Sequence, residues 1–148
     1  MDRGLSAAIA EVKELRERGD LLLAFDRAQE YLKAWPEAER LKHEGLLALA
    51  RAGATDHARR RFAEWNLAAS TDTHVQALEG RLLKDRALRL TGAARREAFR
   101  ASGAIYARIN EQEPDYYSAI NAATVAFLAD DSDRSFTLAE GVLANPEI

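Results

Sequence analysis

The hydrophobic positions of this chain recur with a helical spacing, and the pattern repeats after 34 residues. A shift of 34 places aligns Gly19 with Gly53 and Ala24 with Ala58. In each copy a glycine ends one amphipathic segment, and a small residue follows five places later. β-branched residues are scarce and no long stretch alternates with a period of two, so the pattern predicts helices and no strands.

The pattern predicts eight helices. We expect them at residues 5–18, 21–35, 38–52, 56–68, 74–90, 94–112, 116–129 and 134–144. Gly19 and Gly53 are expected to end helices in the left-handed conformation, and Asp20 is expected to cap the second helix. Counted back from Pro114, the third hairpin is roughly ten residues longer than the 34-residue template.

Helix pairs with this period are typical of the tetratricopeptide repeat, which stacks on copies of itself. We therefore expect an all-α fold, a tetratricopeptide-like right-handed solenoid of about four helical hairpins. Small residues such as Ala24, Ala58 and Gly80 are expected where two helices approach closely. The length predicts a single domain, residues 1–148. The last expected helix is too apolar to be the polar terminal cap that a solenoid needs. We therefore expect that the chain is the N-terminal part of a longer protein. As isolated, it is expected to form a homodimer through its C-terminal hairpin.

Composition and motifs narrow the function. The net charge of −3 favours neither nucleic acid nor membrane as a partner. There is no cysteine, and the three histidines lack the spacing of metal ligands. No phosphate loop, nucleophile elbow or apolar leader is present, so we expect no enzyme activity, no metal, no cofactor and a cytoplasmic location.

The first helix of each hairpin is expected to line the concave face of the solenoid. Counting from Val12, Leu46, Gly80 and Ala123 as inward positions places Ile9 and Arg16 on that face. The same count gives a set of candidate binding residues with an excess of basic side chains: Arg40, His43, Arg51, His74, Arg81, Lys84, Asp85 and Tyr117. Such a set favours an anionic ligand, with arginine contacting phosphate or carboxylate and tyrosine stacking on a base. Alternatively, Arg81 and Asp85 simply pair four residues apart on one helix.

Two stretches carry a more specific resemblance: Gly80-Arg81-Leu82-Leu83-Lys84-Asp85, and residues 116–130 with Ile120-Asn121 inside them. In this order they resemble the TRAFs-binding repeat region of the apoptosis signal-regulating MAP kinase kinase kinases and of bacterial multidomain signalling or defence proteins. The resemblance adds Asn121 to the candidate residues. It implies a regulatory module without chemistry of its own, attached to an effector domain, and a ligand derived from a nucleotide.

Two functions therefore stay open. The leading prediction is a non-catalytic regulatory or scaffolding domain that mediates protein–protein interaction in a signalling or defence protein. The alternative is a small-molecule sensor that binds a nucleotide-like anionic ligand in the concave face.

Overall fold

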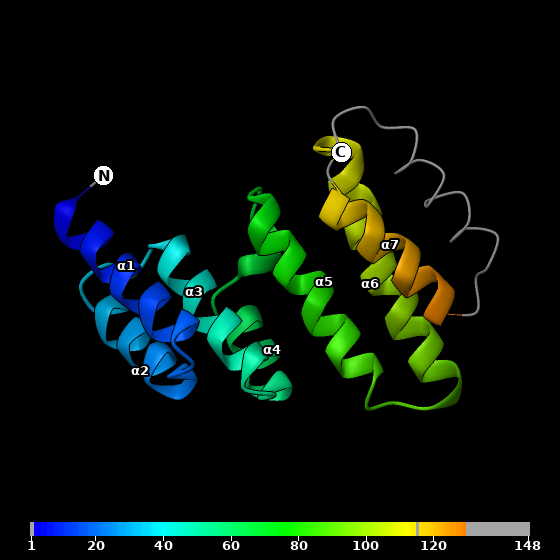
Figure 1. The fold of residues 1–148 in the computed structure, drawn as a ribbon, viewed down its shortest axis with the longest axis horizontal. Helices are drawn as coiled ribbons and strands as arrows, with labels where there is room; N and C mark the ends of the chain where they lie inside the picture. Colours follow the sequence, from blue (N-terminus) through cyan, green and yellow to red (C-terminus); the bar gives the residue numbers. More distant parts are fainter. Residues whose placement is uncertain (1, 115, 130–148) are drawn as a thin grey trace. The chain divides into compact units, whose positions relative to one another are not determined.

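The computed structural model of the protein describes residues 2–114 and 116–129. In these ranges the chain forms α1 (Arg3–Glu17), α2 (Leu21–Leu32), α3 (Glu39–Arg51), α4 (Thr55–Glu64), a short 3₁₀ helix η1 (Leu67–Ala69), α5 (Thr73–Ala87), α6 (Gly92–Gln112) and α7 (Tyr116–Leu128) (Figure 1). The described part of the chain contains no strand. The all-α prediction is confirmed, whereas the helix expected at 134–144 lies outside the described residues.

The chain divides into two compact units, Met1–Ala69 and Ser70–Ile148, called unit 1 and unit 2 below. The expected single domain and the continuous concave face across all hairpins stay predictions.

In unit 1, α2 packs against both α1 and α3, and α1 also contacts α3 (Figure 1). The core is built from the apolar stripe of each helix, including Val12, Ala24, Ala28 and Leu41, all fully buried. The small residues allow this closeness: a Cβ added to Gly45 would lie 2.8 Å from the Cβ of Ala28. The expectation of small residues at helix contacts is confirmed here.

In unit 2, the long helix α6 packs against both α5 and α7. Phe99 and Tyr106 of α6 are fully buried, as are Val125 and Ala129 at the end of α7. Gly80 on α5 again marks a close approach, because an added Cβ would lie 2.9 Å from the ring of Tyr106.

The ends of the helices confirm some predictions and correct others. Gly19 and Gly53 have φ of +93° and +81°, the left-handed conformation expected of them. Asp20 precedes α2, but its side chain makes no capping hydrogen bond. It accepts one from Nε of Arg18 at 2.8 Å instead, so the predicted cap is wrong.

Three helices end at least three residues earlier than expected, and one of them is α5, which ends at Ala87 rather than Leu90. The second helix ends at Leu32 rather than Trp35, because tight turns precede Pro36 and a residue before proline is disfavoured in a helix. The fourth helix ends at Glu64 rather than Ala68. Asn66 follows with φ of +53°, a left-handed conformation that asparagine tolerates and that interrupts the helix before η1.

Candidate functional site

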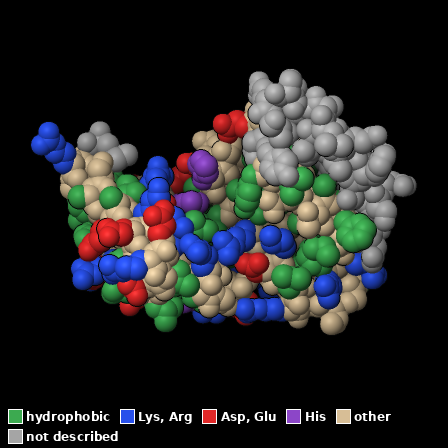
Figure 2. Space-filling model, viewed as in Figure 1, with side chains coloured by type: hydrophobic (Ala, Val, Ile, Leu, Met, Phe, Trp, Pro, Cys, Tyr) green, Lys and Arg blue, Asp and Glu red, His purple; other side chains and the backbone are tan. Residues whose placement is uncertain are grey.

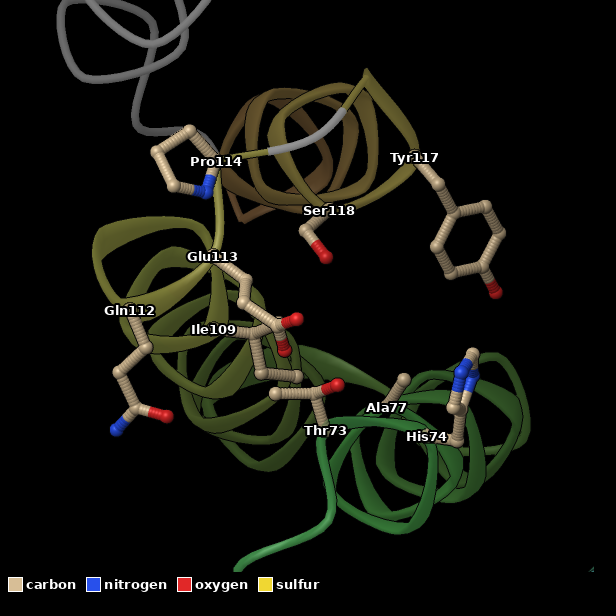
Figure 3. Close-up of a pocket in the computed structure, with 9 residues that line it drawn as sticks. All are labelled: Thr73, His74, Ala77, Ile109, Gln112, Glu113, Pro114, Tyr117 and Ser118. Atoms are coloured by element: carbon tan, nitrogen blue, oxygen red, sulfur yellow. The ribbon is translucent and has the colours of Figure 1, made fainter.

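A cavity of about 730 Å³ lies in unit 2, between the beginning of α5, the end of α6 and the beginning of α7. Figure 3 shows the Glu113 carboxylate and the Ser118 hydroxyl directed into this space, with Tyr117 and His74 on one side of it. This cavity is called the unit 2 pocket, and its lining residues are Thr73, His74, Ala77, Ile109, Gln112, Glu113, Pro114, Tyr117 and Ser118.

The first turn of α5 is held in place by a local hydrogen-bond network. Asp72 caps the helix, and its Oδ1 accepts a hydrogen bond from the backbone N–H of His74 at 2.8 Å. The Asp72 N–H in turn donates to Oγ of Ser70 at 3.0 Å, and the Gln76 amide donates to the Ser70 carbonyl at 3.1 Å. The cap therefore places Thr73 and His74 at the pocket with a fixed backbone.

The end of α6 forms another wall of the pocket. The N–H of Glu113 donates to the carbonyl of Ile109 at 2.8 Å, which closes the last turn of the helix. Pro114 follows, and a proline disfavours helical backbone at the residue before it. The chain thus leaves the helix at Glu113 and turns its carboxylate into the cavity (Figure 3).

Tyr117 at the beginning of α7 completes the pocket. Its backbone carbonyl accepts a hydrogen bond from Nδ2 of Asn121 at 2.8 Å. Its ring meets the ring of Tyr106 edge to face, with the centroids 6.1 Å apart. The Tyr117 side chain is more than half exposed, whereas Tyr106 behind it is fully buried.

Tyr106 lies one helical turn before Ile109 on α6, and Gly80 provides the space for its ring. Oγ of Ser102, one turn earlier on α6, donates to the Gly80 carbonyl at 2.6 Å and fixes the contact between α5 and α6. Burial raises the pKa of Tyr106, and the neighbouring Tyr117 adds to the rise. The phenol therefore stays protonated at any physiological pH.

Three of the candidate residues, Arg81, Lys84 and Asp85, lie on α5 beyond the part of the helix that lines the pocket. Ala77 lines the pocket, and Arg81 follows four residues later on the same helix face. Nε of Arg81 lies 3.7 Å from Oδ2 of Asp85, and both side chains are partly buried. Lys84 is half-buried one turn beyond Arg81. The pairing of Arg81 with Asp85 is thus present, but this distance is too long for a hydrogen bond.

The structure brings together only part of the predicted set. His74 and Tyr117 line the unit 2 pocket, Arg81, Lys84 and Asp85 follow on α5, and Asn121 turns its amide to its own helix. The remaining three belong to α3 of unit 1, where Arg40 and Arg51 are exposed and His43 is half-buried.

Two other positions predicted for the concave face are wrong. Ile9 is buried in the core of unit 1. Nε of Arg16 donates to Oε2 of Glu44 at 2.9 Å, and the two side chains are only 12% and 6% exposed. The count from Val12 could not foresee this, because the partner is a buried glutamate on α3.

Sequence reasoning missed the contribution of α6. Ile109, Gln112 and Glu113, at the end of this helix, line the pocket but were not among the predicted binding residues. The signal was present in the extra length of the third hairpin, which extends α6 to 21 residues. Nothing in the sequence pattern indicated that Tyr106 would lie next to the pocket.

Unit 1 has a second cavity of about 610 Å³, on α2, α4 and their ends, lined by Asp26, Gln29, Glu30, Leu32, Lys33, Arg61 and Trp65. Its charges already compensate one another. Lys33 pairs with Glu30, and Arg61 pairs with Glu64 while its guanidinium lies over the Trp65 ring. A ligand there would have to displace these contacts, so the unit 2 pocket is the stronger candidate.

On the face shown in Figure 2, basic side chains are interspersed with acidic and hydrophobic ones. This face therefore offers no uniformly basic surface to an anion.

Residues 7–126 match the sequence family Tetratricopeptide Repeats-Sensor, abbreviated TPR-S. The chain belongs to this family. No curated protein and no solved structure matches the TPR-S chain. The match confirms the predicted repeat; the finer resemblance to the TRAFs-binding type is not part of it.

In the described part of this TPR-S chain, no helix is long and apolar enough to cross a membrane. Among the same residues, the histidine, aspartate and glutamate side chains form no group of three that could hold a metal ion.

Proposed function

We propose that this TPR-S chain is a non-catalytic sensor domain that binds a small, nucleotide-like anion in the unit 2 pocket. The observation that carries the proposal is the pocket itself: three helices converge on a cavity with polar groups on each wall. The sensor designation of the family supports it.

The distribution of charge indicates what kind of molecule would fit. Glu113 lies beside the first turn of α5, and Arg81 and Lys84 lie two to three turns further along that helix. Seven residues of helix separate His74 from Arg81, a distance of about 10 Å. A ligand with hydrogen-bond donors at one end and an anionic group at the other would satisfy both ends.

A nucleotide has this polarity. Its base amino group or ribose hydroxyls could donate to Glu113, and its phosphate could accept from Arg81. The exposed ring of Tyr117, with His74 beside it, offers an aromatic surface for stacking.

Calorimetry and thermal shift with adenosine monophosphate, guanosine monophosphate and their parent nucleosides test the proposal. A ligand that binds only the folded state raises the melting temperature. We expect Arg81→Ala to weaken nucleotide affinity about 10- to 100-fold, the equivalent of one charge-assisted hydrogen bond.

Arg100→Ala is the matched control, because Arg100 is exposed on α6 and lies nine residues before Ile109, the first residue of this helix in the pocket wall. Its affinity should equal that of the wild type. Failure of all these compounds to bind, or equal affinity in the Arg81 and wild-type proteins, would contradict the proposal.

A protein-interaction role is the second candidate, because α7 exposes Ile120, Phe127 and Leu128 in the described structure. An exposed apolar face of this kind suits a protein contact, including the homodimer predicted from the sequence. Sedimentation at several concentrations should show self-association in the wild type and its loss in Phe127→Ser. A monomeric wild type at every concentration would exclude the homodimer.

A further inference from the structure

The hydroxyl of Tyr106 is fully buried and forms no hydrogen bond of ordinary geometry among the described residues, although the Tyr117 side chain lies close enough to raise its pKa through a poorly aligned contact. Such a group destabilises a fold, because a poorly aligned contact does not replace the bonds to water that it gives up. A phenylalanine would fill the same space without this cost. The hydroxyl therefore needs an explanation other than packing.

Its position supplies one. Tyr106 is one helical turn from Ile109, a residue of the pocket wall, and its ring packs edge to face against Tyr117, which also lines the cavity. Arg81 and Asp85 act on the Tyr106 pKa in opposite senses, so both charges lie within electrostatic reach of the phenol. Tyr106 thus lies behind the wall of the unit 2 pocket and not in its lining, and its ring packs on Gly80, the residue before Arg81.

We propose that Tyr106 is the inner binding residue of this pocket, an inference that rests on the proposed function. Its hydroxyl would donate a hydrogen bond to an anionic oxygen of the ligand beside Arg81. Tyr117 would act as the cover of Tyr106, with its ring moving aside as the ligand enters. The chemistry recognised is a phosphate or carboxylate oxygen.

The available donors agree with this assignment. The Arg81 Nε is 3.7 Å from Asp85, too far for a hydrogen bond, so this donor is not used by that carboxylate. The Tyr106 phenol keeps its proton because burial raises its pKa, and it can only donate to an anion in that form. Gly80 contributes indirectly, because any side chain there would displace the Tyr106 ring.

Tyr106→Phe tests the proposal with two independent measurements. The melting temperature should rise by a few degrees, because an unpaired buried hydroxyl is removed. The affinity for adenosine monophosphate should fall about tenfold or more, whereas the affinity for adenosine, which lacks the anionic group, should not change. Inorganic phosphate and citrate, tested separately, distinguish a phosphate from a carboxylate as the preferred anion.

Tyr31→Phe is the matched control. The Tyr31 hydroxyl donates to Glu11, so its removal should lower the melting temperature and leave ligand affinity unchanged. Tyr117→Phe should keep the cover in place, and Tyr117→Ala should expose Tyr106 to phosphate.

The outcomes separate this inference from the proposed function. Wild-type protein that binds none of the probes would overturn both. Nucleotide binding that Tyr106→Phe leaves unchanged, or an equal loss for adenosine and its monophosphate, would overturn only the role of Tyr106. A lower melting temperature in Tyr106→Phe would also overturn it, because the hydroxyl would then have a partner in the folded protein.

Discussion

The two units share the same helical repeat, but they differ in how the first helices of successive hairpins pack. These helices are α1 and α3 in unit 1, and α5 and α7 in unit 2. In unit 1, α1 contacts α3 directly, and the buried ion pair of Arg16 with Glu44 joins them. In unit 2, the corresponding helices α5 and α7 both pack on α6, and a cavity of about 730 Å³ lies among the three. One unit closes this surface and the other leaves room for a ligand.

The repeat register locates the difference. Arg16 lies four residues after Val12, and the equivalent position after Gly80 is Lys84. Glu44 lies two residues before Leu46, and the equivalent position before Ala123 is Asn121. A neutral amide cannot form the ion pair, and Asn121 donates to the Tyr117 carbonyl instead.

The second helix of the hairpin changes as well. α2 has 12 residues and α6 has 21, so the end of α6 reaches the beginnings of α5 and α7 and adds Glu113 to the surface. The packed surface of unit 1 and the pocket of unit 2 thus differ in two features. Unit 2 lacks the ion pair of Arg16 with Glu44, and its second helix is longer. Three substitutions test this comparison, beginning with the largest expected effect.

Arg16→Ala should destabilise unit 1 by about 3 kcal/mol, because it leaves the Glu44 carboxylate buried and unpaired. Urea denaturation measures the change. The double substitution Arg16→Met with Glu44→Leu should recover most of it, since an apolar pair of similar volume needs no charge compensation.

Lys13→Ala is the control for this experiment. Lys13 pairs with Glu17 at 3.9 Å, but both side chains are more than half exposed. Its loss should cost about 0.5 kcal/mol or less. Equal effects of the Lys13 and Arg16 substitutions would show that the buried pair does not hold α1 against α3.

Gly80→Ala should destabilise unit 2 by about 1–2 kcal/mol. The new Cβ would lie 2.9 Å from the buried Tyr106 ring, and the strain exceeds the gain in helix propensity. Gly103→Ala on α6 is matched to it, because there the Cβ would make an ordinary contact of 3.7 Å with Val125. That variant should be neutral or up to about 1 kcal/mol more stable. Thermal unfolding that ranks them the other way would contradict the packing described for α5 and α6.

Glu79→Gln should have the smallest effect and change only the pH dependence of stability. Burial raises the pKa of Glu79 above its ordinary value of 4.5, and Arg108 opposes the rise only partly. The folded protein therefore holds this proton more tightly than the unfolded chain, and its contribution to stability is lost as pH rises from 4.5 through the folded-state pKa.

Between pH 4 and pH 7, the free energy of unfolding should therefore decrease less steeply with pH for Glu79→Gln than for the wild type. Denaturation curves recorded at several pH values measure this difference. Identical pH profiles of the two proteins would mean that Glu79 is solvated.

Much of the fold follows from local rules in the sequence. The glycines at 19 and 53 end helices because they adopt positive φ, and Ala24 and Ala58 are buried because a helix contact leaves space only for a methyl group. Seven of the eight expected helices lie in the described residues and are present, with errors of a few residues at their ends. The family match over residues 7–126 agrees with this repeat pattern.

The site depended on contacts that no periodicity encodes. Counting along one helix selected His74 and Tyr117, which line the unit 2 pocket, but it also placed Arg16 on an open face that Glu44 closes. The register predicts which side of its own helix a residue occupies. Only the packing of α6 against α5 and α7 decided that Glu113 enters a cavity and that Tyr106 is buried behind Tyr117, because these neighbours come from other helices.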